Sequence, residues 1–148
     1  MPLILIDTNV IVYACDPGEP AKREQAGRVL RFLEQAGNGR LSVQGLSEFV
    51  SATTRRLRPP LTVTEAAQQV ERLMLSFPIF DLTPMIVTEA LRGVRDHQLS
   101  FYGAQVWAAA RLNQTPIIFS EDFNSGSTLD GVRFINPFAP NFVLDNWG

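Results

Sequence analysis

The 148-residue chain contains few of the side chains on which many enzyme sites depend: it has one cysteine, one histidine and one lysine. Cys15 alone cannot form an intrachain disulfide. His97 alone supports neither a metal site built on a histidine pair nor a triad with a second histidine candidate. Lys22 lies too early in the chain for a P-loop, which holds its lysine inside a glycine-framed motif. Catalytic chemistry must therefore depend mainly on carboxylates.

The sequence also has no basic-then-apolar leader and no long apolar span, so we expect a cytoplasmic protein without a membrane segment. Its length fits one domain, which at this size buries about 68 to 70% of its unfolded surface. The net charge of −2 argues against a general nucleic-acid coat but permits a local basic patch. We predict a single domain over residues 1–148, of which 138–148 form a C-terminal tail.

Short apolar runs alternate with stretches of helical spacing, which is the pattern of a parallel α/β sandwich. Turn and stop signals such as Pro59-Pro60 separate these segments. The predicted strands are 3–6, 40–43, 77–82, 117–119 and 132–135, and the predicted helices are 21–35, a helix carrying 46–57, 62–75, 84–95 and 100–112.

Three carboxylates follow predicted strands and would share one edge of the sheet. Asp7 ends the first strand, Glu48 lies in the first turn of the helix after the second, and Asp122 follows the strand near the C-terminus. The carboxyl ends of parallel strands are where α/β sheets place ligands. Gathered carboxylates stay ionised only with a cation among them, and oxygen ligands select hard ions such as Mg²⁺ or Mn²⁺. The pattern indicates metal-assisted phosphoryl chemistry.

Each acid also has a purely structural interpretation. Asp7 is a good N-cap for a following helix, and Glu48 near a helix start interacts favourably with the helix dipole. Asp122 is compatible with an ordinary turn. Glu121 and Asp130 are expected to be solvated loop acids. The joint placement of three acids at one predicted edge is what favours a functional site.

Several motifs resemble, in order and spacing, the signatures of PIN domains. They are Ile6-Asp7-Thr8-Asn9, Leu46-Ser47-Glu48-Phe49, Leu99-Ser100-Phe101-Tyr102-Gly103-Ala104 and Ser120-Glu121-Asp122-Phe123. More narrowly, Asp130-Gly131-Val132 and Ile135-Asn136-Pro137-Phe138 resemble the VapC-type toxins of toxin-antitoxin pairs. The resemblance implies a central, mainly parallel sheet flanked by helices, and Mg²⁺- or Mn²⁺-dependent cleavage of RNA. It implies that Asp7 and Asp122 are metal ligands and that Glu48 holds metal directly or through water.

The same resemblance suggests roles for Asn9 and Ser120, which match polar positions that orient ligands and water around such acids. Turn chemistry is the alternative for both residues. The resemblance also implies a homodimer and a cognate antitoxin whose segment occupies a groove on the toxin. The apolar tail, Phe142-Val143-Leu144 with Trp147, is either a contact surface or a strap over the core.

The chain departs from the family's pattern at Gly103, where the pattern has an aspartate. With Ser100 as the N-cap, Gly103 is the third helical residue. An acidic or amide side chain at that position usually accepts a hydrogen bond from the backbone N–H of a serine cap. Close backbone packing is the structural alternative. Affinity for hard cations follows the charge of the ligands, so three acids should hold metal less well than four. We therefore predict impaired activity, whether the glycine is natural or engineered.

Arg55, Arg56 and Arg58 cluster at a predicted helix C-terminus. Positive charge is favourable there because of the helix dipole, whatever the function. Contact with RNA phosphates is the alternative, since a polyanion must approach an acidic pocket.

The sequence thus predicts a VapC-type toxin, a metal-dependent endoribonuclease neutralised by a cognate antitoxin. One alternative is a catalytically silent PIN-like module that binds its antitoxin or RNA without cutting. Another is a DNA nuclease with the same acids, which matched RNA and DNA strands would separate because only RNA has a 2′-hydroxyl.

Overall fold

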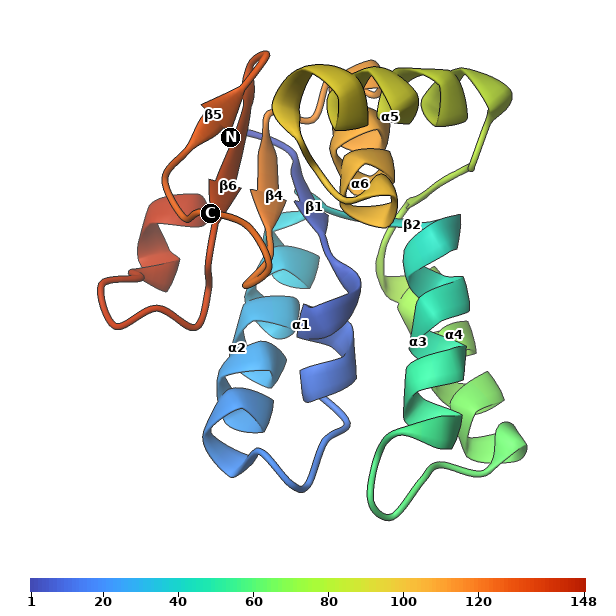
Figure 1. Cartoon of the computed structure of the whole chain (residues 1–148). Helices are drawn as coiled ribbons and strands as arrows, with labels where there is room; N and C mark the ends of the chain where they lie inside the picture. Colours follow the sequence, from blue (N-terminus) through green and yellow to red (C-terminus); the bar gives the residue numbers. More distant parts are fainter.

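The computed structural model describes residues 1–148 and contains one six-stranded sheet in the order β3-β2-β1-β4-β6-β5 (Figure 1). All neighbouring strands are parallel except β5, which runs antiparallel to β6. The predicted mainly parallel sheet is therefore confirmed. The strands are β1 (Ile4–Ile6), β2 (Gly39–Ser42), β3 (Ile79–Phe80), β4 (Ile117–Phe119), β5 (Thr128–Leu129) and β6 (Val132–Ile135).

Six α-helices and a final 3-10 helix complete the chain, and none of them has the length and apolar character needed to span a bilayer. Local signals explain several of their ends. Thr62 and Glu65 form the predicted capping box of α4, and Pro84 opens α5 after the cap Thr83. The helices are α1 (Thr8–Tyr13), α2 (Pro20–Ala36), α3 (Val43–Arg55), α4 (Val63–Ser76), α5 (Pro84–His97), α6 (Phe101–Leu112) and η1 (Leu144–Trp147).

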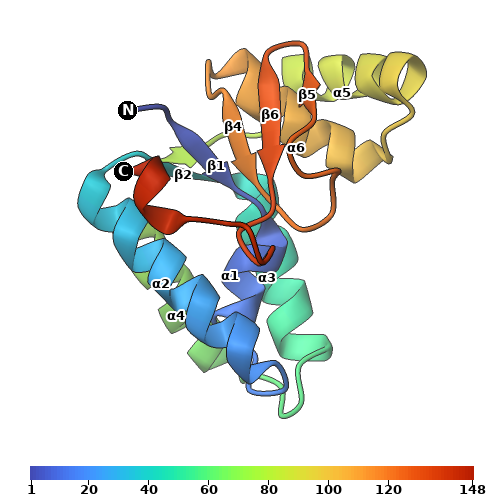
Figure 2. The ribbon, with the colours of Figure 1, turned by 90° about the vertical axis from the view of Figure 1, so that its left-hand side faces the viewer.

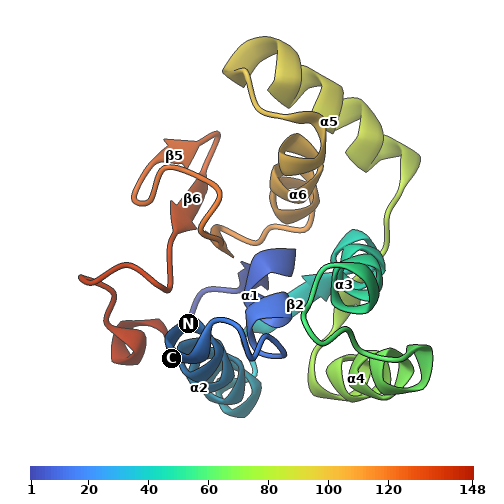
Figure 3. The same ribbon diagram turned by 60° about the horizontal axis from the view of Figure 1, so that its bottom comes forward.

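The sheet has a hydrophobic cluster on each face, because side chains alternate along each strand. Ile4 and Ile6 belong to the cluster that includes residues of α1, α2 and α3, whereas Leu5 belongs to the cluster formed with α5 and α6. Figure 2 shows α5 and α6 on one side of the strands and α1 to α4 on the other. Seen from below, α1 lies between α2 and the α3–α4 pair (Figure 3). Each strand of the sheet's centre is therefore buried on both faces.

The C-terminal tail packs over the core. Of the two alternatives given for it, a contact surface or a strap over the core, this is the second. The rings of Phe142 and Trp147 meet Phe119 edge-on, with centroid separations of 5.5 and 5.6 Å. Asn38, which is buried, donates hydrogen bonds from Nδ2 to the carbonyl oxygens of Pro2 (3.1 Å) and Trp147 (2.8 Å). One side chain therefore holds both ends of the chain.

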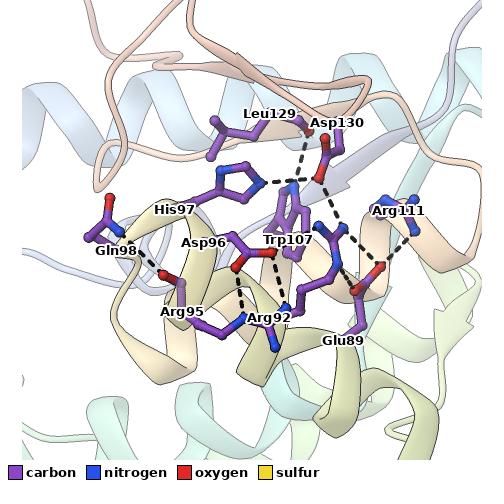
Figure 4. A network of polar contacts seen from close by, with 10 residues as sticks. All are labelled: Glu89, Arg92, Arg95, Asp96, His97, Gln98, Trp107, Arg111, Leu129 and Asp130. Atoms are coloured by element: carbon purple, nitrogen blue, oxygen red, sulfur yellow. Dashed lines mark hydrogen bonds and ion pairs between the residues drawn. The ribbon is translucent and has the colours of Figure 1, made fainter.

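Strand β5 is not among the predicted strands. It joins β6 through a turn at Asp130 and Gly131, whose φ values of 47° and 83° suit the two-residue turn of a hairpin. Asp130 is exposed in this turn, as expected of a solvated loop acid, but it also accepts hydrogen bonds from Arg92 (2.9 Å) and His97 (3.1 Å) on α5 (Figure 4). Arg92 also pairs with Glu89. This network ties α5 to the hairpin turn.

Candidate active site

The predicted site lies at the point where the chain reverses its path across the sheet. From β1 the chain moves to β2 and β3 on one side, and later to β4 and β6 on the other. The carboxyl ends of the strands at such a switch point form a crevice in which open α/β sheets bind ligands. Asp7 follows β1 and Ser120 follows β4, so both lie at this crevice.

Asp7 serves both as a helix cap and as a wall of the site. Its Oδ1 accepts the backbone N–H of Thr8 at 2.8 Å, and its Oδ2 accepts the hydroxyl of Ser120 at 2.7 Å. Burial raises the pKa of Asp7 to about 6, with further upward contributions from Asp122 and Glu48, while the hydrogen bonds from Ser120 and Thr8 lower it. The structural interpretation of Asp7 is thus correct without excluding the functional one.

Asn9 and Ser120 lie between the two aspartates. Nδ2 of Asn9 donates to Ser120 Oγ and to Asp122 Oδ2, both at 3.0 Å, and the backbone N–H of Asp122 donates to Ser120 Oγ at 3.1 Å. Ser120 is completely buried. A continuous set of hydrogen bonds therefore fixes Asp7 and Asp122 relative to each other.

Glu48 reaches the same place from α3. The expectation that it lies in the first helical turn is wrong, because Ser42 caps the helix and the helix begins at Val43. Glu48 is therefore in the second turn, where the favourable effect of a helix N-terminus has largely faded. The helix dipole accordingly gives little reason for a carboxylate at this position.

The three acids line one cavity of about 170 Å³. No three His, Cys, Asp or Glu side chains lie close enough together to form a ready-made metal site. The carboxylate atoms available to bind a metal are nevertheless all oxygens. Mg²⁺ usually keeps several water ligands and binds only one or two carboxylates. The cavity and its donors therefore fit a hydrated divalent cation. The remaining lining residues are Gln44, Ser100, Tyr102, Gly103, Val106 and Phe123.

Gly103 is the third residue of α6, as predicted, and its N–H donates to Ser100 Oγ at 3.2 Å. A Cβ at this position would lie 2.8 Å from Ser100 Oγ and 3.4 Å from Cζ of Phe123. The Phe123 ring is itself stacked on Phe134, with centroids 4.2 Å apart. The capping serine and this ring therefore pack closely against the side of Gly103 that a side chain would occupy.

The expectation that Glu121 is a solvated loop acid is wrong. It accepts hydrogen bonds from the phenol of Tyr13 and from Nζ of Lys22, the latter at 3.0 Å. Nζ of Lys22 also lies 4.7 Å from the centre of the Tyr13 ring. The chain's single lysine thus balances the acid next to Asp122. No local pattern could have indicated this, because Lys22 and Glu121 are 99 residues apart.

Gln44 and Gln105 also contribute to the site, although no sequence pattern singled them out. Nε2 of Gln44 donates to Glu48 Oε1 at 2.7 Å, and Nε2 of Gln105 donates to Gln44 Oε1 at 2.7 Å. The four-residue spacing of Gln44 and Glu48 on one helix face was the only local signal.

The structure does not bring the three candidate RNA-binding arginines to the cavity. Arg55 ends α3, about 10 Å along the helix axis from Glu48. Nη1 of Arg58 donates to the carbonyl oxygens of Arg55 and Leu57, both at 3.0 Å. Arg58 thus caps the end of α3, which is the structural role weighed for this cluster.

Comparisons with solved structures show the same fold in toxins. VapC20 of Mycobacterium tuberculosis, described as a sarcin-ricin loop cleaving toxin, has a TM-score of 0.66 and 20% identity over 88% of this chain and 98% of its own. A toxin-antitoxin complex from Klebsiella pneumoniae has a TM-score of 0.64 and 15% identity, covering 91% and 98%. VapBC2 of Rickettsia felis, bound to a promoter DNA fragment, has a TM-score of 0.64 and 11% identity, covering 89% and 96%.

No curated protein matches the sequence. The family profile of the PIN domain, in contrast, matches residues 4–125, which include all three acids of the cavity. The chain therefore belongs to the PIN domain family.

Proposed function

We propose that the chain is a VapC-type toxin, a Mg²⁺- or Mn²⁺-dependent endoribonuclease that a cognate antitoxin neutralises. The observation that carries the proposal is the convergence of Asp7, Glu48 and Asp122 on one cavity at the switch point of the sheet. Their mutual repulsion contributes to the raised pKa of Asp7, which is the electrostatic situation that a bound cation relieves. The described activity of VapC20, cleavage of an RNA loop, agrees with this chemistry.

In this proposal Asp7, Glu48 and Asp122 would hold the cation, which when bound would supply an activated water and positive charge at the phosphodiester. The hydroxyl of Ser120 donates its hydrogen bond to Oδ2 of Asp7, which favours the ionised form of that carboxylate. Asn9 holds Asp122 through Oδ2, and the other oxygen of Asp122 has no hydrogen-bond partner in the protein. Oε2 of Glu48 is likewise free of protein partners, while Oε1 is held by Gln44. Asp122 and Glu48 therefore each keep one oxygen free of protein partners, whereas each oxygen of Asp7 already accepts one hydrogen bond and has only its second lone pair for a ligand.

We further propose that Gly103 weakens this activity, because the site lacks a fourth carboxylate. The close approach of Ser100 and Phe123 to Gly103 favours an alternative, a catalytically silent PIN-like module that binds its antitoxin or RNA. In that case the position has adapted to packing instead of metal binding. Both functions use the same fold and differ in whether phosphodiester bonds are cut.

The proposed partners are an RNA substrate, an antitoxin and a second copy of the chain in a homodimer. Two of the similar structures contain antitoxin with toxin, which supports the antitoxin. A toxin that acts on cellular RNA would work in the cytoplasm. Arg55, Arg56 and Arg58 stay weak candidates for phosphate contact, since one of them already caps a helix.

Cleavage of a mixed RNA pool by the purified chain tests the proposal. Reactions contain Mg²⁺, Mn²⁺ or EDTA, and DNA strands of matching sequence serve as a second substrate. We expect metal-dependent cutting of RNA that Asp122→Asn abolishes and Gly103→Asp increases. Cutting that persists in Asp122→Asn would contradict the assigned site. No cutting by either the natural chain or Gly103→Asp would favour the silent module.

A further inference from the structure

Two buried glutamines connect α3 to α6 directly beside Glu48. Gln44 on α3 is 8% exposed and Gln105 on α6 is 4% exposed. Gln105 donates to Gln44 at 2.7 Å, and Gln44 donates to Glu48 Oε1 at 2.7 Å and to the carbonyl oxygen of Tyr102 at 3.2 Å. Buried amides must be paired to be tolerated, and the Gln44 amide is paired on both its nitrogen and its oxygen.

The surrounding groups fix the direction of both amides. The carbonyl of Tyr102 can only accept, and so can an ionised Glu48, so the NH₂ group of Gln44 must face them. The oxygen of Gln44 then faces Gln105, which must present its own NH₂ group. Flipping either amide would bring two donors or two acceptors together. The hydrogen bonds therefore run in one direction only: Gln105 donates to Gln44, and Gln44 donates to Glu48.

This arrangement determines which carboxylate oxygen of Glu48 is free to bind a ligand in the cavity. Its Oε1 is held from α3 by Gln44, and Gln44 is held in turn from α6 by Gln105 and Tyr102. Only Oε2 is left without a protein partner. No hydrogen bond joins Gln105 to Glu48 directly, so the hydrogen-bonded path from Gln105 to Glu48 passes through Gln44.

We propose that Gln44 and Gln105 are positioning residues that hold Glu48 with one free oxygen available to a hydrated divalent cation. The inference rests on the function proposed above, because it assigns the amides a purpose in cation binding. A purely structural role, namely joining α3 to α6, is the alternative. The two differ in whether cation affinity depends on the hydrogen bond itself or only on the stability of the packing.

Isothermal titration of Mn²⁺ into the natural chain and its variants tests the proposal. Gln105→Met keeps the size of the side chain but removes the donor to Gln44. Removing a group that orients a metal ligand typically lowers metal affinity by about 10- to 100-fold. We expect a loss of about tenfold or more for Gln105→Met and at least as much for Gln44→Met. Gln68→Met, on the exposed side of α4, is the matched control and should bind as the natural chain does.

The double variant Gln44→Met with Gln105→Met separates positioning from packing. The double variant no longer contains the Gln44 oxygen that Gln105→Met leaves unpaired, although Glu48 Oε1 loses its donor, so part of the stability lost in Gln105→Met should recover. If the amides position Glu48, Mn²⁺ affinity stays low in the double variant despite this recovery. If affinity recovers together with stability, the amides have only a structural role and the proposal is overturned.

The side-chain amide signals of Gln44 in a ¹⁵N NMR spectrum keep this test independent of the proposed function. In the natural chain they should exchange slowly with solvent, and in Gln105→Met they should shift and exchange faster, because the Gln44 oxygen loses its donor. Unchanged Gln44 signals in Gln105→Met would overturn the inference. A natural chain that binds no Mn²⁺ would overturn the proposed function, and the inference about cation binding with it, even if the NMR result shows that the amides are coupled. Equal Mn²⁺ affinity in all variants would overturn the inference alone.

Discussion

Ser120 donates a 2.7 Å hydrogen bond to Asp7 although 113 residues separate them in the sequence. The two residues follow the adjacent parallel strands β4 and β1, whose register pairs Ile6 with Phe119. The contact is therefore set by the topology of the sheet. Ser120 is completely buried and Asp7 is 8% exposed, so the hydrogen bond between them is shielded from water.

Asp7 should make the metal-free protein less stable as the pH rises. Its folded pKa of about 6 exceeds its ordinary value of 3.8, so between these values the folded chain retains a proton that the unfolded chain has lost. Stability falls through this range, and the loss is complete above it. In EDTA, Asp7→Asn should be more stable than the natural chain by about 1 to 3 kcal/mol at about pH 8 and by nothing at about pH 3.

Urea unfolding across this pH range measures the difference. Asn is also a good N-cap, so α1 should survive the substitution. Asp145→Asn, at an exposed site in η1, is the control for replacing an aspartate by asparagine. A variant at position 7 that is less stable at every pH would show that repulsion and burial do not dominate at this site.

Gly103→Asp and Gly103→Ala separate packing from charge. Both add a Cβ that must displace the hydroxyl of Ser100, so each should lose about 1 kcal/mol of unfolding free energy without metal, the usual effect of a weakened cap. Only Gly103→Asp adds a carboxylate that can bind the metal ion. Mn²⁺ should therefore raise the melting temperature of Gly103→Asp more than that of Gly103→Ala. An equal response to Mn²⁺ would exclude position 103 as a ligand position.

Glu89 should stabilise the fold at neutral pH and not in acid. Hydrogen bonds from Arg92 lower the pKa of Glu89, so its contribution is present above the ordinary pKa of 4.5 and is lost as the pH falls through the folded value. The arginine partners are about one third exposed, which reduces the effect by screening. Glu89→Gln should cost about 1 kcal/mol at neutral pH. Denaturation at neutral and strongly acidic pH checks this, with exposed Glu34→Gln as the control.

Two glycines should respond to alanine in opposite directions. Gly131 has a φ of 83° in the hairpin turn, which an L-residue adopts only with strain, so Gly131→Ala should destabilise by about 1 to 2 kcal/mol. Gly27 is inside α2, where alanine is favoured by up to about 1 kcal/mol. Its new Cβ would meet only the mobile end of Arg31. Thermal unfolding of both variants tests the pair, and destabilisation of both would contradict it.

The parts of the site that the sequence predicted follow from one rule, that buried parallel strands end at a common edge. Asp7 follows β1 directly and Asp122 is the third residue after β4, and the apolar runs before them are unambiguous. Glu48 was predicted in the first turn of its helix but lies in the second. The helix begins earlier than expected because Ser42 is both the last residue of β2 and the N-cap of α3. The apolar stripe of the helix begins later than the helix itself.

The partners of these acids were beyond prediction for a different reason. Gln105 meets Gln44 across 61 residues, and Lys22 meets Glu121 across 99. Such contacts depend on how two helices, or a helix and a loop, pack in three dimensions. Polar residues that look solvated in a linear pattern can therefore be paired, as Asp130 is with His97.

The hydrogen bonds of Asn38 to Pro2 and Trp147 bring the two ends of the chain to one side chain. A short peptide linker could therefore join the ends, with new termini opened in the loop after Arg55, at the opposite end of α3 from the cavity. Such a circular permutant would keep Asp7, Glu48 and Asp122 in one unbroken polypeptide. The order of the acids along the chain would change, while the cavity they line would not.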